Sequence, residues 1–240
     1  MMFWYFLFGV TAIADDLCTE GGAREREACL RYEIEKLKGS KSSEKPSPAD
    51  EVKAQDLLKQ MQQAMVETDI SKAQALYDDI DQNYSSTRTF RRAKKIGEEL
   101  EVFGKPMFDI GTVDINWLQG EESAQLGKDG LTIFIFWEEW CPHCRREVPN
   151  MQNVLDTYSK EGLQIVGFTK LTRNSTEEEA KQFLKDNGVS YSMGVEDGTL
   201  SYYFNVSGIP ASVVVQDGTV IYRGHPARIT DKMITNWLSR

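Results

Sequence analysis

A run of apolar residues at 131–137, LTIFIFW, leads within four residues into the motif CPHC at 141–144. The run lacks the alternation of a half-exposed strand, so it predicts a strand that is covered on both faces. Pro142 has no N–H to leave unsatisfied and favours a first helical turn, so we expect a helix from Pro142 to about Lys160. Pro149 is expected to bend or break that helix after its second turn. A buried strand followed by a helix whose start carries two cysteines indicates a fold of the α/β class.

The rest of the C-terminal half continues this alternation of strands and helices. Upstream of the motif, FDIGTVDINWL at 108–118 predicts short strands. Downstream, the pattern predicts a strand at 163–169, a helix at 176–187, a short helix near 200–204, two strands within 211–224 and a final helix at 230–239. The order from the buried strand onward is β-α-β-α-β-β-α, which predicts a mixed sheet with helices on both faces.

The spacing of Cys141 and Cys144 suits reversible disulfide chemistry. At a helix N-terminus the unpaired backbone amides and the positive end of the helix dipole favour a thiolate over a thiol. Cys144 is three residues further on, one turn along the same face, where side chains lie about 5–6 Å apart at Cβ. A modest adjustment brings such a pair into disulfide range. We therefore expect Cys141 and Cys144 to open and close a disulfide without a change of fold.

Charged side chains surround the two cysteines in the sequence. His143 would stabilise a neighbouring anion when protonated, or it is an ordinary exposed histidine. Glu147 lies one turn beyond Cys144, so its carboxylate is expected on the sulfur face, where it can exchange the proton of the reaction. The alternative for Glu147 is a solvated helix glutamate. Glu138 and Glu139 flank the end of the strand and are expected to face solvent.

Residues 108–240 resemble the thioredoxin superfamily, and within it the TlpA/ResA-like extracytoplasmic thiol–disulfide oxidoreductases. The segment FWEEWCPHCRREVP at 136–149 is similar to the family pattern of a strand, FW..WC..C and E.P. The segment GIPASVVVQDGTVIYRG at 208–224 resembles the family's cis-proline strand and hairpin. The resemblance implies a thioredoxin-like mixed sheet with flanking helices over residues 105–240.

The resemblance also implies the chemistry of the site. Cys141 would be the attacking thiolate, Cys144 the resolving thiol and Glu147 the active-site acid. Ile135 occupies the strand position where thioredoxin has a buried aspartate, which leaves Glu147 as the proton relay. No cofactor is implied beyond the redox-active disulfide of Cys141 and Cys144.

Four residues would contact the substrate by the same resemblance. Trp140 would be the aromatic residue beside the nucleophile, with Pro142 on its other side. Pro210 would be the cis-proline, and the backbone of Ile209 would face the mixed disulfide. The pair Pro142-His143 resembles the oxidase DsbA, so the direction of electron flow stays open between a reductase and an oxidase or isomerase.

The first fourteen residues, MMFWYFLFGVTAIA, predict a signal peptide with an A-x-A cleavage site. They are too short to span a bilayer, which takes roughly 20 apolar residues. No basic residue precedes the apolar run, so the alternatives are an uncleaved hydrophobic tail or a misplaced start codon. The expected location is periplasmic or otherwise extracytoplasmic. A charged segment and linker follow at 15–49.

The linker segment holds two further cysteines, Cys18 and Cys29. On a continuous helix they would lie about 16 Å apart, too far for a disulfide. A turn at Gly21-Gly22 would let them meet, and an oxidising compartment favours such a structural disulfide. Pairing with a second chain or with a redox substrate is the alternative.

Residues 50–104 predict a smaller, all-helical region, with helical patterns at 54–65, 70–84 and 90–103 that each bury one face. No heptad persists through it, so it is expected to be a helical spacer. The alternative is an arm that forms a homodimer.

The formal charge of −9 argues against a nucleic-acid partner, because phosphate binding needs clustered Lys and Arg. The expected partners are protein thiol or disulfide substrates and a redox donor or acceptor protein. Two other classes compete with the enzyme. The first is a partner-binding module, and the second is a copper or zinc carrier that uses Cys141, His143 and Cys144. Tetrahedral zinc needs four ligands and His225 is remote in sequence, so no metal centre is expected. A peroxidase is disfavoured because no Thr-x-x-Cys precedes the nucleophile.

Overall fold

The computed structural model describes residues 45–120 and 126–239. Within this part of the chain, residues from Pro48 onward form one compact unit. The predicted signal peptide, most of the segment 15–49, and the predicted pair Cys18 and Cys29 lie outside the described residues.

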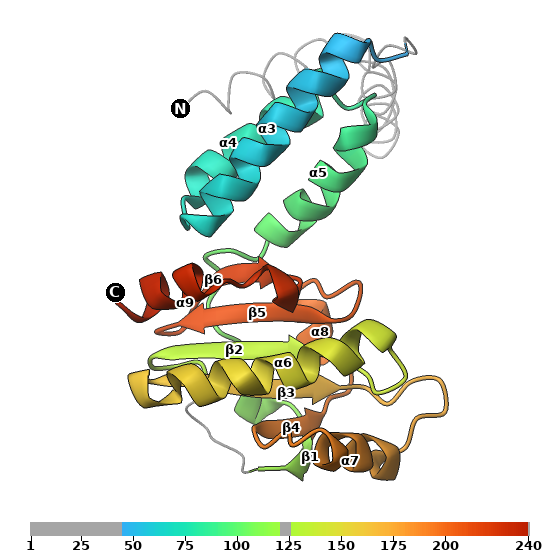
Figure 1. The fold of residues 1–240 in the computed structure, drawn as a ribbon, viewed down its shortest axis with the longest axis vertical. Coiled ribbons are helices and arrows are strands. Elements are labelled where there is room, and N and C mark those ends of the chain that lie inside the picture. The colour runs from blue at the N-terminus through green and yellow to red at the C-terminus, as the bar shows by residue number, and fades with distance from the viewer. Residues whose placement is uncertain (1–44, 121–125, 240) are drawn as a thin grey trace, which may run out of the picture. The chain divides into compact units, whose positions relative to one another are not determined.

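The C-terminal half is built on a six-stranded mixed sheet (Figure 1). Its strands are β1 (Asn116–Gln119), β2 (Leu131–Phe136), β3 (Leu163–Thr169), β4 (Ser192–Val195), β5 (Ala211–Gln216) and β6 (Thr219–Gly224). The spatial order is β1-β4-β3-β2-β5-β6. Strands β2, β3 and β4 run parallel, whereas β1, β5 and β6 run antiparallel to their neighbours. The expected thioredoxin-like mixed sheet is therefore confirmed.

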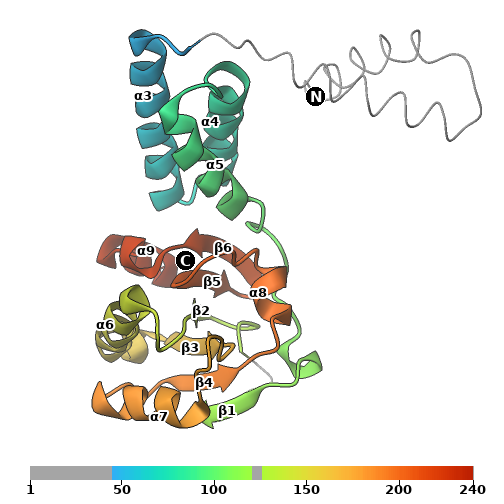
Figure 2. The same ribbon diagram turned by 90° about the vertical axis from the view of Figure 1, so that its right-hand side faces the viewer.

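Helices cover both faces of this sheet (Figure 2). They are α6 (Pro142–Tyr158), α7 (Glu177–Asp186), α8 (Thr199–Tyr203) and α9 (Asp231–Leu238), with short 3-10 turns η1 (Ile110–Thr112), η2 (Ser159–Glu161) and η3 (Pro226–Arg228). Alternate residues of β2 point to opposite faces. Ile133 and Ile135 share a core with α6, α7 and α9, while Phe134 and Phe136 pack against Phe204, the residue that follows α8. All six residues of β2 are buried, as the continuous apolar run predicts.

Three local predictions need correction. The predicted order β-α-β-α-β-β-α lacks β4 and does not count α8, so the observed order from β2 onward is β-α-β-α-β-α-β-β-α. A break at Pro149 is wrong, because α6 continues to Tyr158, close to the predicted helix end near Lys160. Proline removes a single intrahelical hydrogen bond, and packing of Val148 and Met151 against the sheet holds the helix on either side of it. The segment 108–118 holds one 3-10 turn and the start of β1 instead of several strands.

The helical region consists of α3 (Pro48–Val66), α4 (Ile70–Asn83) and α5 (Arg88–Leu100). These helices pack side by side around their own core, which includes Met61, Ile80 and Ile96. Asp69 and Thr87 cap α4 and α5 by accepting backbone N–H groups. None of the helices in residues 45–120 and 126–239 is long and apolar enough to cross a membrane.

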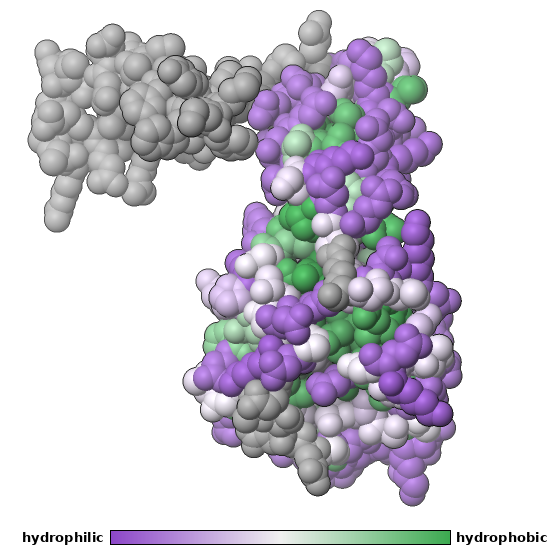
Figure 3. Space-filling view, turned by 90° about the vertical axis from the view of Figure 1, so that its left-hand side faces the viewer, coloured by the Kyte–Doolittle hydropathy of each residue, from purple (hydrophilic) through white to green (hydrophobic). Residues whose placement is uncertain are grey.

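Helix α5 packs against β6 through buried charges. The Glu99 carboxylate, 2% exposed, accepts hydrogen bonds from the guanidinium of Arg228 at 2.6 and 2.7 Å. Arg223 of β6 donates to the same carboxylate at 3.4 Å. Trp237 of α9 donates to the hydroxyl of Thr68, at 3.3 Å. Polar contacts therefore join the helical region to the sheet domain. On the face shown in Figure 3, hydrophilic side chains cover most of the surface of the described residues.

Candidate active site

Cys141 and Cys144 lie at the end of the central strand, at the start of α6. Both are free thiols, Cys141 at 4% exposure and Cys144 fully buried. Cys141 is the N-cap of α6, and its sulfur accepts the backbone N–H of Cys144 at 3.4 Å. A donor aimed at the sulfur from the positive end of a helix stabilises negative charge on that sulfur. The arrangement suits Cys141 as the sulfur that meets other molecules.

A cis peptide bond between Ile209 and Pro210 faces this sulfur. The carbonyl oxygen of Ile209 lies 3.8 Å from Sγ of Cys141. The fold therefore brings together two motifs that are 68 residues apart in the sequence, because β5 pairs with β2 along its whole length.

Cys144 is set apart from Cys141 by its surroundings. Burial raises the pKa of the Cys144 thiol well above its ordinary value, and the hydrogen-bonded side chain of Cys141 raises it further. A smaller opposing effect comes from the backbone of Glu138. Cys144 therefore holds its proton until another group removes it.

Glu147 lies one turn beyond Cys144 and is only 3% exposed. One carboxylate oxygen accepts from Nε of Arg146 at 2.8 Å, and the other from the amide of Asn150 at 3.4 Å. The alternative of a solvated helix glutamate is therefore wrong.

The remaining predicted residues of the motif lie at its surface. Pro142 and His143 are exposed, and Trp140 is half-buried. Nδ1 of His143 lies 3.5 Å from the guanidinium of Arg146. Trp140 and Pro142 flank Cys141 in the chain, and the Ile209 carbonyl lies 3.8 Å from its sulfur.

Glu138 does not face solvent as expected but is buried, at 3% exposure. Its carboxylate accepts three hydrogen bonds, from Nε1 of Trp140 at 3.0 Å and from the N–H and hydroxyl of Thr172 at 2.7 and 2.9 Å. The loop that connects β3 to α7 folds back over the end of β2 and supplies two of these donors. Nothing near position 138 in the sequence indicates this partner, 34 residues away.

His225 is a site residue that sequence reasoning set aside as remote. It follows β6, where Gly224 pairs with Ser212, two residues after Pro210. The turn η3 that begins after it contacts α6. Burial lowers the pKa of His225, whereas the negative charge of Glu147 opposes that shift. Counting residues along the predicted hairpin would have placed His225 beside the cis-proline.

The described residues offer no metal site. No group of three or more His, Cys, Asp or Glu side chains in residues 45–120 and 126–239 is arranged to hold a metal ion. The metal-carrier alternative has no support from this part of the chain.

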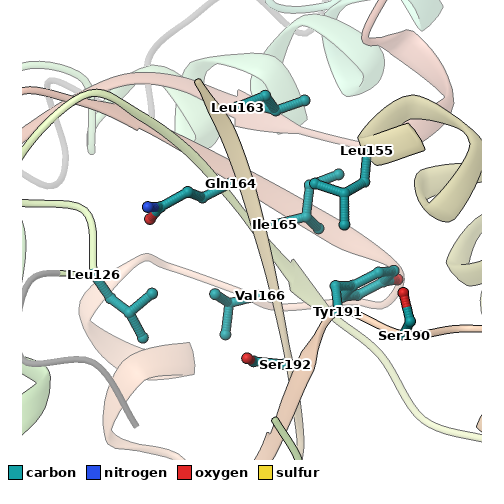
Figure 4. A pocket seen from close by; sticks show the side chains of 9 residues that line it. All are labelled: Leu126, Leu155, Leu163, Gln164, Ile165, Val166, Ser190, Tyr191 and Ser192. Carbon is teal, nitrogen blue, oxygen red and sulfur yellow. The ribbon is translucent and has the colours of Figure 1, made fainter. Parts of the chain in front are cut away.

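A hollow of about 330 Å³ lies at the other end of the sheet (Figure 4). Its lining includes Ile165 and Tyr191, and it extends from the beginning of β3. Strand β3 runs parallel to β2, with Leu163 opposite Leu131, whereas Cys141 follows the last residues of β2. The hollow is therefore separate from the two cysteines.

Comparisons with known proteins find a matching family and named relatives. Residues 105–223 match the AhpC/TSA family. The chain is 22% identical over 121 residues to the sporulation thiol-disulfide oxidoreductase A of Bacillus subtilis, covering 50% of this chain and 73% of that protein. It is 23% identical over 123 residues to the thiol-disulfide oxidoreductase ResA of Halalkalibacterium halodurans, covering 50% and 68%.

Solved structures that match part of this chain include a thioredoxin-family thiol:disulfide interchange protein from Chlorobium tepidum. It is 26% identical, with a TM-score of 0.47, and the match covers 56% of this chain and 97% of that one. The crystal structure of StoA from Bacillus subtilis is 23% identical, with a TM-score of 0.40, and the match covers 46% and 83%.

Proposed function

Because residues 105–223 belong to the AhpC/TSA family of thioredoxin-like proteins, we propose that this chain is an exported thiol–disulfide oxidoreductase that reduces disulfides in protein substrates. One observation carries the proposal. The sulfur of Cys141 begins a helix, accepts the N–H of Cys144 and faces the Ile209 carbonyl beside a cis-proline. The names of the relatives ResA and sporulation thiol-disulfide oxidoreductase A support the same reaction class.

The reaction proceeds by two sulfur exchanges. The Cys141 thiolate attacks one sulfur of the client disulfide, and the other client sulfur leaves and takes up a proton. Cys144 then loses its proton and attacks the sulfur of Cys141 in the mixed disulfide. The client departs as a dithiol, having gained two electrons and two protons, and Cys141 and Cys144 are left as a disulfide.

The second exchange needs a base, because burial keeps the proton on Cys144. Glu147 is a buried carboxylate one turn beyond Cys144 on the same helix, and we assign it the proton relay. His225 interacts electrostatically with Glu147 and offers a route for the proton toward the surface. In this scheme the Ile209 carbonyl accepts a backbone N–H of the client, while Trp140 and Pro142 contact its side chains.

The opposite direction of electron flow is the second candidate. The dipeptide Pro142-His143 between the cysteines favours an oxidase, for which the same exchanges run in reverse. An equilibrium potential measured against glutathione distinguishes the two. A value near the thioredoxin potential of about −270 mV supports the reductase, and a value near about −120 mV supports the oxidase.

Trapping the intermediate tests the exchange itself. The variant Cys144→Ser retains the nucleophile but cannot resolve the mixed disulfide, so it accumulates covalent adducts with clients that thiol reagents release. The variant Cys141→Ser forms none. If Cys144→Ser yields no adduct with a disulfide-containing peptide, the proposed mechanism is wrong.

Export and the role of the helical region complete the proposal. Export depends on the predicted signal peptide at 1–14, and N-terminal sequencing of the mature protein tests it. The helical region is proposed as a spacer that holds the redox domain, with a homodimer as the alternative outcome of a light-scattering measurement. The electron donor is expected to be another redox protein.

A further inference from the structure

The loop between β3 and α7, residues 170–176, is fastened to the residues that precede Cys141. Glu138 accepts both the N–H and the hydroxyl of Thr172, and the Glu139 carboxylate accepts the hydroxyl of Ser175 at 2.9 Å. Leu171 packs against the core beneath the loop. The loop is therefore held in place on the active-site side of the sheet.

The backbone of this loop adopts an unfavourable conformation to reach that position. Leu171, Arg173 and Asn174 have positive φ angles of 53°, 56° and 64°. Asparagine tolerates this region, but for leucine and arginine it costs roughly 1–2 kcal/mol each. The hydrogen bonds that Glu138 and Glu139 accept from Thr172 and Ser175 offset that cost. Backbone strain that is maintained in this way is concentrated at functional sites.

The loop places one cation against the residue next to the nucleophile. The guanidinium carbon of Arg173 lies 3.7 Å from the centre of the Trp140 ring, within the range of a cation–π interaction. The edge of the same indole is fixed by its hydrogen bond to Glu138. Arg173 is itself exposed, so its charge is both positioned and accessible to a docking molecule.

The exposed charges around Cys141 are mainly positive. Arg145 lies over the ring of Phe183 at 4.7 Å and donates to the backbone carbonyl of Glu139. Arg146 is paired with Glu147, and His143 is exposed beside it.

The negative groups of this region are largely withdrawn from solvent. Glu138 and Glu147 are each 3% exposed, and Glu139 is bonded to Ser175. Further along, Glu177 pairs with Lys181. In a chain of net charge −9, the exposed charged groups named here next to Cys141 are therefore the cations Arg145, Arg146 and Arg173.

We propose that Arg173, held on Trp140 beside Cys141, selects client disulfides whose cysteines are flanked by acidic residues. This inference rests on the proposed oxidoreductase function and names its substrate class. A client carboxylate next to the attacked sulfur would meet the guanidinium as the sulfur reaches Cys141. Charges at the rim of an interface act mostly on the association rate and weaken with salt.

Three short disulfide peptides test the proposal. They are identical except for the residues flanking the cysteines, which are Glu, Gln or Lys. The second-order rate constant for their reduction by the full, pre-reduced chain is followed by the change in tryptophan fluorescence. The wild-type protein should reduce the Glu peptide about fivefold faster than the Lys peptide at low salt, in line with an exposed ion pair. That ratio should fall toward one as salt is raised.

Variants of Arg173 test whether this residue causes the preference for the Glu peptide. Arg173→Gln should reduce the Glu-to-Lys ratio to below about twofold, whereas Arg173→Lys, which keeps the charge, should retain most of it. Arg91→Gln is the matched control, because it removes one positive charge from the exposed face of α5 and should leave the ratio unchanged.

Two results overturn the inference. One is a wild-type ratio near one at low salt, a measurement that needs no variant. The other is a ratio that survives in Arg173→Gln. If the wild-type protein reduces none of the peptides, including the Gln peptide, the proposed function fails and the inference fails with it. Reduction of the Gln peptide without a charge preference leaves the proposed function standing.

Discussion

The three hydrogen bonds to Glu138 provide a direct test of the site's construction. Oε2 of Glu138 accepts from Trp140 and from the N–H of Thr172, while Oε1 accepts from the Thr172 hydroxyl. Glu138→Ala removes all three bonds, each worth about 1.5 kcal/mol with a charged acceptor. Thr172 is exposed and Trp140 half-buried, so water replaces part of this interaction. The variant also no longer buries a charged carboxylate, and this gain in stability offsets a further part of the loss. We therefore expect a net loss of about 2–3 kcal/mol in the free energy of unfolding.

The variant Glu138→Gln distinguishes the effect of the hydrogen-bond geometry from the effect of the carboxylate charge. A glutamine with its oxygen at the position of Oε2 keeps the bonds from Trp140 and the Thr172 N–H. Its amide nitrogen then faces the Thr172 hydroxyl, which can rotate to accept instead of donate. All three contacts survive without the negative charge, so we expect a loss of about 1 kcal/mol or less.

Urea denaturation of the reduced protein measures both variants. The midpoint should move by the larger amount for Glu138→Ala, with an unchanged slope, since the denatured state is not altered. Thr172→Val, which removes only the hydroxyl bond, should lie between the wild type and Glu138→Ala. Equal destabilisation by alanine and glutamine, or less than about 0.5 kcal/mol for both, would falsify the assignment of Glu138 as the group that fastens the loop.

Three further predictions concern titration and buried charge. Burial raises the pKa of Cys144, so the unfolded chain releases this proton first. The free energy of unfolding of the reduced protein should therefore fall above about pH 9, by up to about 1.4 kcal/mol per pH unit. Denaturation curves between pH 8 and 10 should show a smaller fall for Cys144→Ser. Burial lowers the pKa of His225, so the unfolded chain binds this proton more readily, and stability should decline as the pH drops below about 6.5. His225→Gln should flatten that decline; an unchanged profile would count against the burial of His225. Glu99→Ala leaves the buried Arg223 without its carboxylate, and calorimetry should find a loss of about 3–5 kcal/mol, with less than 1 kcal/mol contradicting the buried pairing.

The local order of strands and helices follows from the sequence because each signal is short in range. The uniform apolar run of β2 predicts its burial, and the capping box of Thr176 and Glu179 predicts the start of α7, where both reciprocal hydrogen bonds are present. Pro142 likewise predicts that the two cysteines lie at the start of a helix, which is α6 in the structure. These features depend on residues within about one turn of each other.

The features that the sequence does not predict depend on distant partners. Glu138 is buried because a loop 34 residues away supplies its donors, and a carboxylate beside a strand end ordinarily faces water. His225 is an exception, because the register of the predicted hairpin, now seen as β5 and β6, would have placed it beside the cis-proline. Arg173 lies on Trp140 through a loop conformation that no turn motif indicates. Side-chain partners set by tertiary folding are therefore beyond the reach of periodicity and spacing.

Because Cys144 is buried, the two sulfurs of the CPHC motif differ in their accessibility before any reaction begins. In the proposed reaction, exchange with other molecules therefore passes through Sγ of Cys141, which is 4% exposed, and not through Cys144, which is fully buried. Under the proposed function, a partner has to bring an accessible sulfur to that atom. Disulfides enclosed within a folded client stay out of reach until the client itself opens.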